Sequence, residues 1–327
     1  MTNEIKASAK QSLEFKISKG SDISSFFTQK TGMDFIDWFN DNCANKETWT
    51  GKHLGKSPET RLRFNQIWDQ FPLMFGTKKI NLAQFIALTS IFINEIGAEM
   101  LPLTEKVGRQ GHPGLAYPFD TINGIKRSYN QSPNKTAFAL FNDSLYIKSK
   151  GGLAQAATLK NTTDKRWGGD VYPQEDFPTS TDLAASGFIR EADFFKFRGR
   201  GFIQTTWRSN YILLIKFIQT YTGKQATVLR YKKRWARLEP DVVATMSTNE
   251  DWDDLFQQSN LEIPCAGIRV HNQASGSYLA LSTSLVTIMG TGKGSIYNMG
   301  LRISGGKEYA KLFQNRVLQV IVALSKE

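Results

Sequence analysis

Residues 197–211 contain the side chains best suited to hold a sugar. The run brings three arginines, two glycines, a glutamine, two threonines and an asparagine close together. Gly199 and Gly201 allow the backbone to approach a partner or to take a positive φ, and Gln204, Thr206 and Asn210 offer hydrogen-bond donors and acceptors. Two other interpretations are a tight turn that needs glycine for packing alone and a fragment of a nucleic-acid-binding segment.

Glu95 is placed where a carboxyl could act as a general acid. It falls in the last turn of an apolar helix expected over residues 81–96, with Asn81 and Gln84 as a capping box and Gly97 as the terminator. Burial and the negative end of the helix dipole both raise the affinity of such a carboxylate for its proton. A glutamate protonated near neutrality is what a glycosidase needs as its acid. Spacing alone also allows a solvent-facing glutamate at a frayed helix end.

Two of these runs match motifs of one enzyme family. Residues 198–211 follow the pattern Arg-Gly-Arg-Gly-x-Ile-Gln-x-Thr-x-x-x-Asn-Tyr. This resembles the signature of the family 19 glycoside hydrolases, the plant-type chitinases and similar bacteriophage endolysins of the lysozyme-like superfamily. Residues 93–98 are similar to the family's Ala-His-Glu-Ser-Gly-Gly, whose glutamate is the acid, with Asn94 in place of the histidine and Ala98 in place of the second glycine. The resemblance covers about residues 80–325, and only short motifs carry it.

The same resemblance implies a second carboxylate. Residues 103–106, Leu-Thr-Glu-Lys, resemble the family's Tyr-Thr-Glu-Glu, which makes Glu105 the expected base. An inverting mechanism needs the two carboxyls roughly 6.5–9.5 Å apart, so that a water fits between them. Glu99 is the competing candidate for the base.

The remaining signature residues take their roles from the family. The resemblance implies that Thr206 helps to hold the water, that Gln204 and Asn210 bind the sugar, and that Arg198 and Arg200 brace the carboxylates.

Three substrate-binding candidates lie outside the signature. Trp167 belongs to a segment similar to the family's Arg-x-Tyr-Gly-Gly and either stacks on a sugar or belongs to the core. Residues 303–306 resemble an Ile-Asn-Gly-Gly loop, with Ser304 in place of a substrate-contacting asparagine. Arg316 resembles an arginine that relatives direct at the second carboxylate. No metal and no organic cofactor is implied.

The resemblance implies a mainly α, lysozyme-like helical fold with a substrate cleft and long loop inserts. We expect residues 1–60 to form a helical extension or an accessory module and residues 61–327 to form the hydrolase domain. Residues 109–192 are rich in Gly, Asn, Ser, Thr and Pro and predict loops with short helices at 137–147 and 152–159. Residues 211–221 and 275–289 also predict apolar helices.

Composition limits the partners. The 41 basic and 30 acidic residues give a net charge of +11, which favours an anionic partner such as nucleic acid, a membrane surface or a bacterial wall. The densest basic run, residues 230–237, alternates with aromatics and is either a solvated helix face or a single-strand binder. Cys43 and Cys265 are expected to be buried thiols. No segment has the length of a membrane span, and residues 1–6 lack the apolar core of a secretory signal.

The sequence therefore predicts a monomeric peptidoglycan-degrading glycoside hydrolase that cleaves a β-1,4 bond with inversion. Its expected partners are the bacterial cell-wall glycan and anionic wall polymers, and not nucleic acid. It would be made in the cytoplasm and act on the wall after lysis, virion delivery or injection. The alternatives are a chitinase and a non-catalytic protein of the same fold that binds glycan or nucleic acid.

Overall fold

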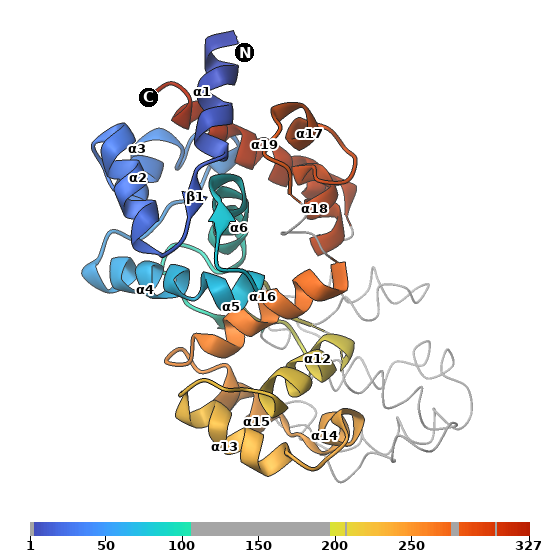
Figure 1. Ribbon diagram of the computed structural model, residues 1–327. Helices are drawn as coiled ribbons and strands as arrows, with labels where there is room; N and C mark the ends of the chain where they lie inside the picture. The colour runs from blue at the N-terminus through green and yellow to red at the C-terminus, as the bar shows by residue number, and fades with distance from the viewer. Residues whose placement is uncertain (1–2, 106–196, 207, 276–280, 305) are drawn as a thin grey trace, which may run out of the picture. The chain divides into compact units, whose positions relative to one another are not determined.

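The computed structural model describes residues 3–105, 197–206, 208–275, 281–304 and 306–327. This part is mainly helical, which confirms the expected class (Figure 1). The chain divides into two compact units: unit 1, of Met1–Pro102 and Pro264–Glu327, and unit 2, of Leu103–Ile263. This division differs from the boundary expected at residue 60. Trp167 and the short helices expected at 137–147 and 152–159 lie outside the described residues.

Unit 1 combines the beginning and the end of the chain. Its N-terminal elements are α1 (Asn3–Leu13), β1 (Lys16–Ile17), α2 (Ser21–Thr31), α3 (Phe35–Asn42), the 3₁₀ helix η1 (Glu47–Trp49), α4 (Pro58–Asp69), α5 (Phe71–Phe75), β2 (Ile80–Asn81) and α6 (Leu82–Glu95). Its C-terminal elements are most of α16 (Glu262–Ser275), then α17 (Leu285–Met289), α18 (Ile296–Ser304) and α19 (Lys307–Leu324). β1 and β2 form a short antiparallel pair in which Ile17 lies opposite Ile80.

Helix α6 is the centre of unit 1, as its apolar sequence predicts. Figure 1 shows it between the N-terminal helices and the C-terminal helices α18 and α19. Asn81 and Gln84 form the expected capping box, and every residue from Leu82 to Ile93 is buried. The helix ends at Glu95, and Gly97 has a φ of 73°, a left-handed conformation that favours glycine.

Residues 1–60 share the core of α6 and are not a separate module. Phe85 of α6 contacts the ring of Phe35 at 5.0 Å between centroids, in an edge-on arrangement. Phe27 packs on the same two rings. Such edge-on aromatic contacts stabilise a core beyond the area that they bury. In the structure, the described part of residues 1–60 therefore packs on α6 within unit 1.

Unit 2 is built from the sequence signature and the helices that follow it. Its described elements are β3 (Leu103–Thr104), β4 (Arg200–Gly201), α12 (Arg208–Gln219), α13 (Ala226–Trp235), α14 (Pro240–Met246) and α15 (Asn249–Leu255). α12 confirms the helix expected at residues 211–221. Tyr211 and Trp252 lie at the centre of the core, with ring centroids 4.6 Å apart and edge-on. Both side chains are fully buried.

Two local predictions were wrong. The helix expected over residues 275–289 is not continuous, since residues 281–284 are not helical and α17 begins only at Leu285. The Ser282 hydroxyl accepts a hydrogen bond from the backbone N–H of Ser284 and turns the chain there, while residues 276–280 lie outside the described ones. The loop expected at residues 303–306 is partly helical, since α18 runs to Ser304 and Gly306 is the N-cap of α19.

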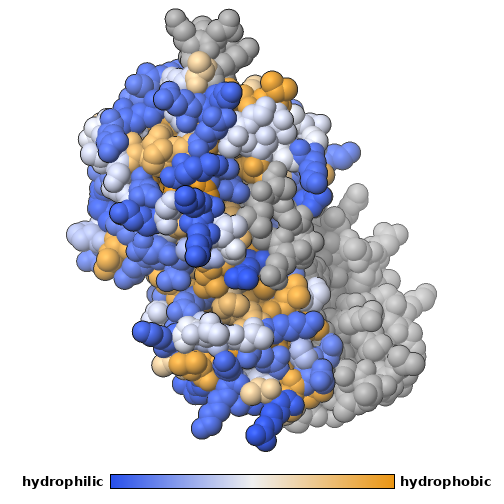
Figure 2. All heavy atoms as spheres, in the orientation of Figure 1, coloured by the Kyte–Doolittle hydropathy of each residue, from blue (hydrophilic) through white to orange (hydrophobic). Residues whose placement is uncertain are grey.

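The described surface on the face drawn in Figure 2 is largely hydrophilic. Within the described ranges, no helix combines the length and the apolar character that crossing a bilayer requires. Cys43 and Cys265 are both buried, as expected, and burial raises the pKa of the Cys43 thiol to about 12.

Candidate active site

Glu95, the predicted acid, lies at the C-terminal end of α6 and is held by two donors. The side-chain amide of Asn94 donates to Glu95 Oε1 at 2.9 Å, and the Tyr309 hydroxyl donates to the same oxygen at 3.0 Å. Among the described residues, no donor reaches Oε2. Glu95 is half-buried and therefore not the freely solvated glutamate of a frayed helix end.

Asn94 is itself fixed in orientation. Its Oδ1 accepts a hydrogen bond from Arg316 Nη1, which leaves the amide nitrogen to face Glu95. The guanidinium of Arg316 also donates from Nε to the carbonyl of Thr48 at 2.8 Å. Arg316, expected as a substrate contact directed at the second carboxylate, is buried and serves the residue next to the first carboxylate.

Glu99, the competing candidate for the base, is engaged elsewhere in unit 1. Its Oε2 accepts a hydrogen bond of 2.6 Å from the hydroxyl of Thr60. Gly55 lies against the other oxygen, because a Cβ built there would stand 2.9 Å from Glu99 Oε1. Glu99 therefore holds the turn after α6 to α4.

In unit 2, a short strand pair brings Glu105 to the signature loop. β3 and β4 are antiparallel, with Leu103 opposite Gly201, and the backbone N–H of Glu105 donates to the carbonyl of Gly199 at 2.8 Å. In return, the Gly199 N–H donates to Glu105 Oε2 at 3.1 Å. The loop closes on itself through two backbone hydrogen bonds between Arg200 and Thr205. Residues almost a hundred positions apart thus form one rigid piece.

The Glu105 carboxyl is subject to opposing influences. Burial raises its pKa, and this is the largest effect. The Gly199 N–H and the charges of Arg198 and Arg200 act in the opposite direction, since they favour the carboxylate. A glutamate in this balance gains proton affinity and so becomes a stronger base than a solvated one, provided that it is ionised.

Arg198 and Arg200 hold the loop from inside. They are 4% and 0% exposed, so neither lines a surface in this arrangement. Arg200 Nε donates to Asp253 Oδ1 at 2.9 Å, and Arg198 Nη2 lies 3.4 Å from the other oxygen of that carboxylate. Arg198 Nε also donates to the carbonyl of Glu105 at 2.9 Å, so the arginines brace the backbone of the predicted base and the side chain of Asp253.

Tyr211 ties the two arginines together. Its buried hydroxyl accepts from Arg200 Nη1 at 3.0 Å and donates to the carbonyl of Arg198 at 2.8 Å. The last residue of the signature is therefore the internal support of the loop.

The remaining signature residues face their own backbone. Gln204 has a φ of 53°, a left-handed conformation, and its amide donates to the carbonyl of Gly201 at 3.2 Å. Thr206 Oγ1 donates to the carbonyl of Gln204 at 2.6 Å, and the Asn210 amide donates to the carbonyl of Thr206 at 2.8 Å. All three side chains are half-buried, so each keeps an accessible part. Ser304 ends α18, and its side chain lies outside the described ones.

The basic run at residues 230–237 is a helix face and not a stacking surface. Its aromatic members Tyr231 and Trp235 are buried at 5% and 3% exposure. Arg230 pairs with Asp254 of α15, and Arg234 Nη1 lies 2.6 Å from Asp251 Oδ1. Single-strand binders stack bases on exposed aromatics, so the structure favours the solvated-face interpretation.

The sequence did not identify two of the residues that matter most here. Tyr309 lies seven residues before Arg316, so both occupy one face of α19, and this spacing is a signal that could have found it. Asp253 belongs to the acidic run Glu-Asp-Trp-Asp-Asp, and this run was a signal for a carboxylate that could pair with the two arginines. Thr48 gave no signal, because it acts through its backbone carbonyl.

The comparisons with known proteins add no relative. No protein-family model, no curated protein and no solved structure matches this chain. Over the ranges that the structure describes, no group of three or more His, Cys, Asp or Glu side chains is arranged to hold a metal ion. The resemblance to the family 19 glycoside hydrolases therefore rests on short motifs alone.

Proposed function

We propose that this chain is a glycoside hydrolase that cleaves a β-1,4 bond of peptidoglycan beside an N-acetylated sugar, with inversion. The observation that carries the proposal is the setting of Glu95. Both donors, Asn94 and Tyr309, bind one oxygen of its carboxyl group. An acid held in this way carries its transferable proton on the other oxygen.

In this mechanism Glu95 protonates the leaving glycosidic oxygen. Glu105 acts as the base on a water, and Thr206 helps to hold that water. The two carboxyls would have to stand roughly 6.5–9.5 Å apart across the substrate. Gln204 and Asn210 would bind the sugar, while Arg198 and Arg200 keep the loop and Glu105 in register.

The net charge of +11 supports peptidoglycan as the substrate. Peptidoglycan carries carboxylates and lies beside anionic polymers, whereas chitin is uncharged. The enzyme would reach the wall by release at lysis, on a virion or by injection.

The test is digestion of isolated peptidoglycan and of chitin oligomers, with the products identified by mass. Glu95→Gln should keep the fold, because an amide can accept the same two hydrogen bonds. It should lose about 100- to 10,000-fold in turnover, the usual contribution of a general acid. Glu105→Gln should also be inactive, and Glu99→Gln should not.

Three outcomes distinguish the alternatives. Products from chitin oligomers alone would identify a chitinase. Binding to glycan without products, from a folded wild-type protein, would identify a non-catalytic binder. A near wild-type rate for Glu95→Gln would exclude Glu95 as the acid.

A further inference from the structure

The segment around η1 reaches the predicted acid through Arg316. The Arg316 guanidinium donates to the carbonyl of Thr48 and lies 5.2 Å from the ring centroid of Trp49. In return, Trp49 Nε1 donates to the Arg316 carbonyl at 3.1 Å. Trp49 is fully buried and Arg316 is 8% exposed, so the contact excludes solvent. A cation–π contact is strongest when it is desolvated in this way.

A second connection reaches the same helix end through Lys52. Its ammonium donates to the backbone carbonyl of Asn94 at 3.1 Å. A cation at this position also compensates the negative end of the α6 dipole. Three residues further on, the N–H of Gly55 donates to the carbonyl of Ala98 at 2.9 Å, in the turn that follows Glu95.

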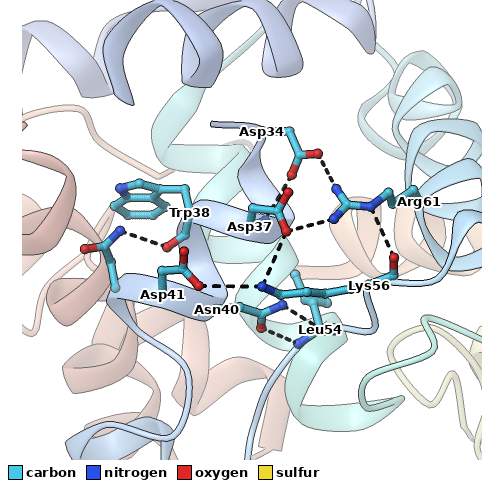
Figure 3. A network of polar contacts seen from close by, with 9 residues as sticks. Asp34, Asp37, Trp38, Asn40, Asp41, Leu54, Lys56 and Arg61 are labelled. Atoms are coloured by element: carbon cyan, nitrogen blue, oxygen red, sulfur yellow. Dashed lines mark hydrogen bonds and ion pairs between the residues drawn. The ribbon is translucent and has the colours of Figure 1, made fainter. Parts of the chain in front are cut away.

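This segment is fixed in turn to α3 and α4, as Figure 3 shows. Asn40 exchanges two hydrogen bonds with the backbone of Leu54, at 2.8 and 2.9 Å. Lys56 bridges Asp37 and Asp41, at 3.5 and 3.6 Å. Arg61 of α4 holds Asp34 and Asp37, so the loop between η1 and α4 has little freedom.

We propose that Tyr309, Asn94 and Arg316 are positioning residues for Glu95, and that residues 47–55 form part of the acid's site. The proposal rests on the function proposed above. Arg316 fixes the Asn94 amide, and the amide and Tyr309 together fix Oε1 of Glu95. The proton is therefore confined to Oε2. After its transfer, the same two donors stabilise the carboxylate that remains.

Tyr309 can keep this role over the working pH range. Burial, followed by the charge of Glu95, raises the pKa of its hydroxyl, so it stays protonated and remains a donor. Among the residues that the structure describes, the charged groups that face Glu95 from the elements packed on α6 are Arg316 of α19 and Lys52 of the η1 loop.

The decisive experiment compares Tyr309→Phe with the control Tyr297→Phe on peptidoglycan. Both remove one hydroxyl from a half-buried tyrosine of unit 1, but Tyr297 has no described contact with Glu95. Loss of a hydrogen bond to a charged group should lower kcat of Tyr309→Phe about 10- to 100-fold, with KM within about twofold. The alkaline limb of its pH–rate profile should move to higher pH, because the Glu95 carboxylate loses a donor. Tyr297→Phe should match the wild type in kcat, in KM and in the pH–rate profile.

Four further variants test the chain of contacts from Trp49 through Arg316 and Asn94 to Glu95. Trp49→Phe keeps a ring under Arg316 but removes the donor to its carbonyl, and Arg316→Lys keeps the charge but not both hydrogen bonds. Each should lower kcat more than it changes KM. Asn94→Ala should do the same, and Asn94→His, which places an imidazole N–H donor beside Glu95, should recover part of the loss seen with alanine. Thermal unfolding of every variant separates these effects from a general loss of fold.

The inference and the proposed function fail in different ways. A wild-type protein without products on any glycan refutes the function. An active wild type whose folded Tyr309→Phe and Arg316→Lys variants keep their kcat and pH profile refutes the positioning network and leaves the function standing.

Discussion

Gly199 is the residue on which the packing around the second carboxylate depends. A Cβ built there would stand 2.7 Å from Gln204 Oε1 and 3.2 Å from Glu105 Oε2. Its backbone is not left-handed, so the requirement for glycine comes from close approach. One added methyl group must therefore displace the side chain of Glu105, the predicted base, or that of Gln204, which is predicted to bind the sugar.

Gly199→Ala should accordingly reduce turnover about 100-fold, the scale on which a misplacement of about 1 Å acts. Overpacking should also lower the free energy of unfolding by about 1–3 kcal/mol. The measurements are kcat on peptidoglycan and denaturant unfolding. Gly292→Ala is the control, since a Cβ at that position meets no atom within 4 Å. Equal effects of the two changes would mean that Gly199 is an ordinary loop glycine.

Glu105 should leave a signature in the pH dependence of stability. Burial raises its pKa on folding. An acid of this kind stabilises the fold fully only below its unfolded pKa of about 4.3, and the contribution is lost as the pH rises through the folded value. At pH 7 the ionised carboxylate is therefore destabilising.

Glu105→Gln should raise the unfolding temperature at pH 7, and the gain should disappear near pH 4. Unfolding scans of both proteins at the two pH values measure this. Glu239→Gln replaces an exposed glutamate of unit 2 and should show no such difference. A gain that is the same at both pH values would point to packing and not to the charge of Glu105.

Among the elements, α6 carries the predicted acid, and its N-terminus can be weakened without touching the site. Asn81 Oδ1 accepts a hydrogen bond from the Gln84 N–H at 2.9 Å, and Gln84 Oε1 accepts one from the Asn81 N–H at 3.0 Å. Asn81→Ala should lower the free energy of unfolding by about 1 kcal/mol, the usual value of an N-cap. Ser284→Ala, at the N-cap of α17, should have little effect, because that residue makes no side-chain cap. Denaturant unfolding of both variants measures these changes, and equal losses of stability in the two would contradict the role of the α6 cap.

Elements with a local signal were predictable from the sequence. The cap of α6, its buried character and its end just before Gly97 follow from Asn81, Gln84, a continuous apolar run and the glycine itself. The pairing of β3 with β4 does not, since each strand has two residues and the pair forms only through contacts far apart in the chain. The role of Asp253 could not be predicted from the sequence either, because tertiary packing decides which carboxylate pairs with a buried arginine.

The N-terminal elements were the largest gap in the sequence-based picture. Their aromatic residues predicted an apolar face but not which helix covers it. The observed contact with Phe85 assigns that face to α6. Arg316 was identified by resemblance, yet its partner Thr48 lies in a segment that resembles nothing in the family. A motif can therefore indicate a functional residue but fail to indicate the residues that orient it.

At the scale of the whole molecule, the relevant property is the net charge of +11. The structure shows which of the basic residues in the densest run are paired and which are exposed. Within the described residues, the ion pairs of Arg230 and Arg234 neutralise part of the densest basic run. Lys233 and Arg237 are exposed and make no described ion pair. If α13 and the turn after it contact an anionic wall, these two residues carry the contact.

Activity on whole peptidoglycan should then fall about tenfold as salt rises, because exposed charges are screened within about 8 Å at physiological ionic strength. Hydrolysis of a short neutral oligosaccharide should barely respond, since partly buried groups are screened much less. The double variant Lys233→Gln, Arg237→Gln should show the high-salt rate on peptidoglycan already at low salt. The control Lys10→Gln, Lys326→Gln removes the same charge from exposed positions of unit 1 and should not. Equal losses in the two double variants would assign the effect to net charge alone, and equal salt sensitivity on both substrates would assign it to the groups that bind the sugar.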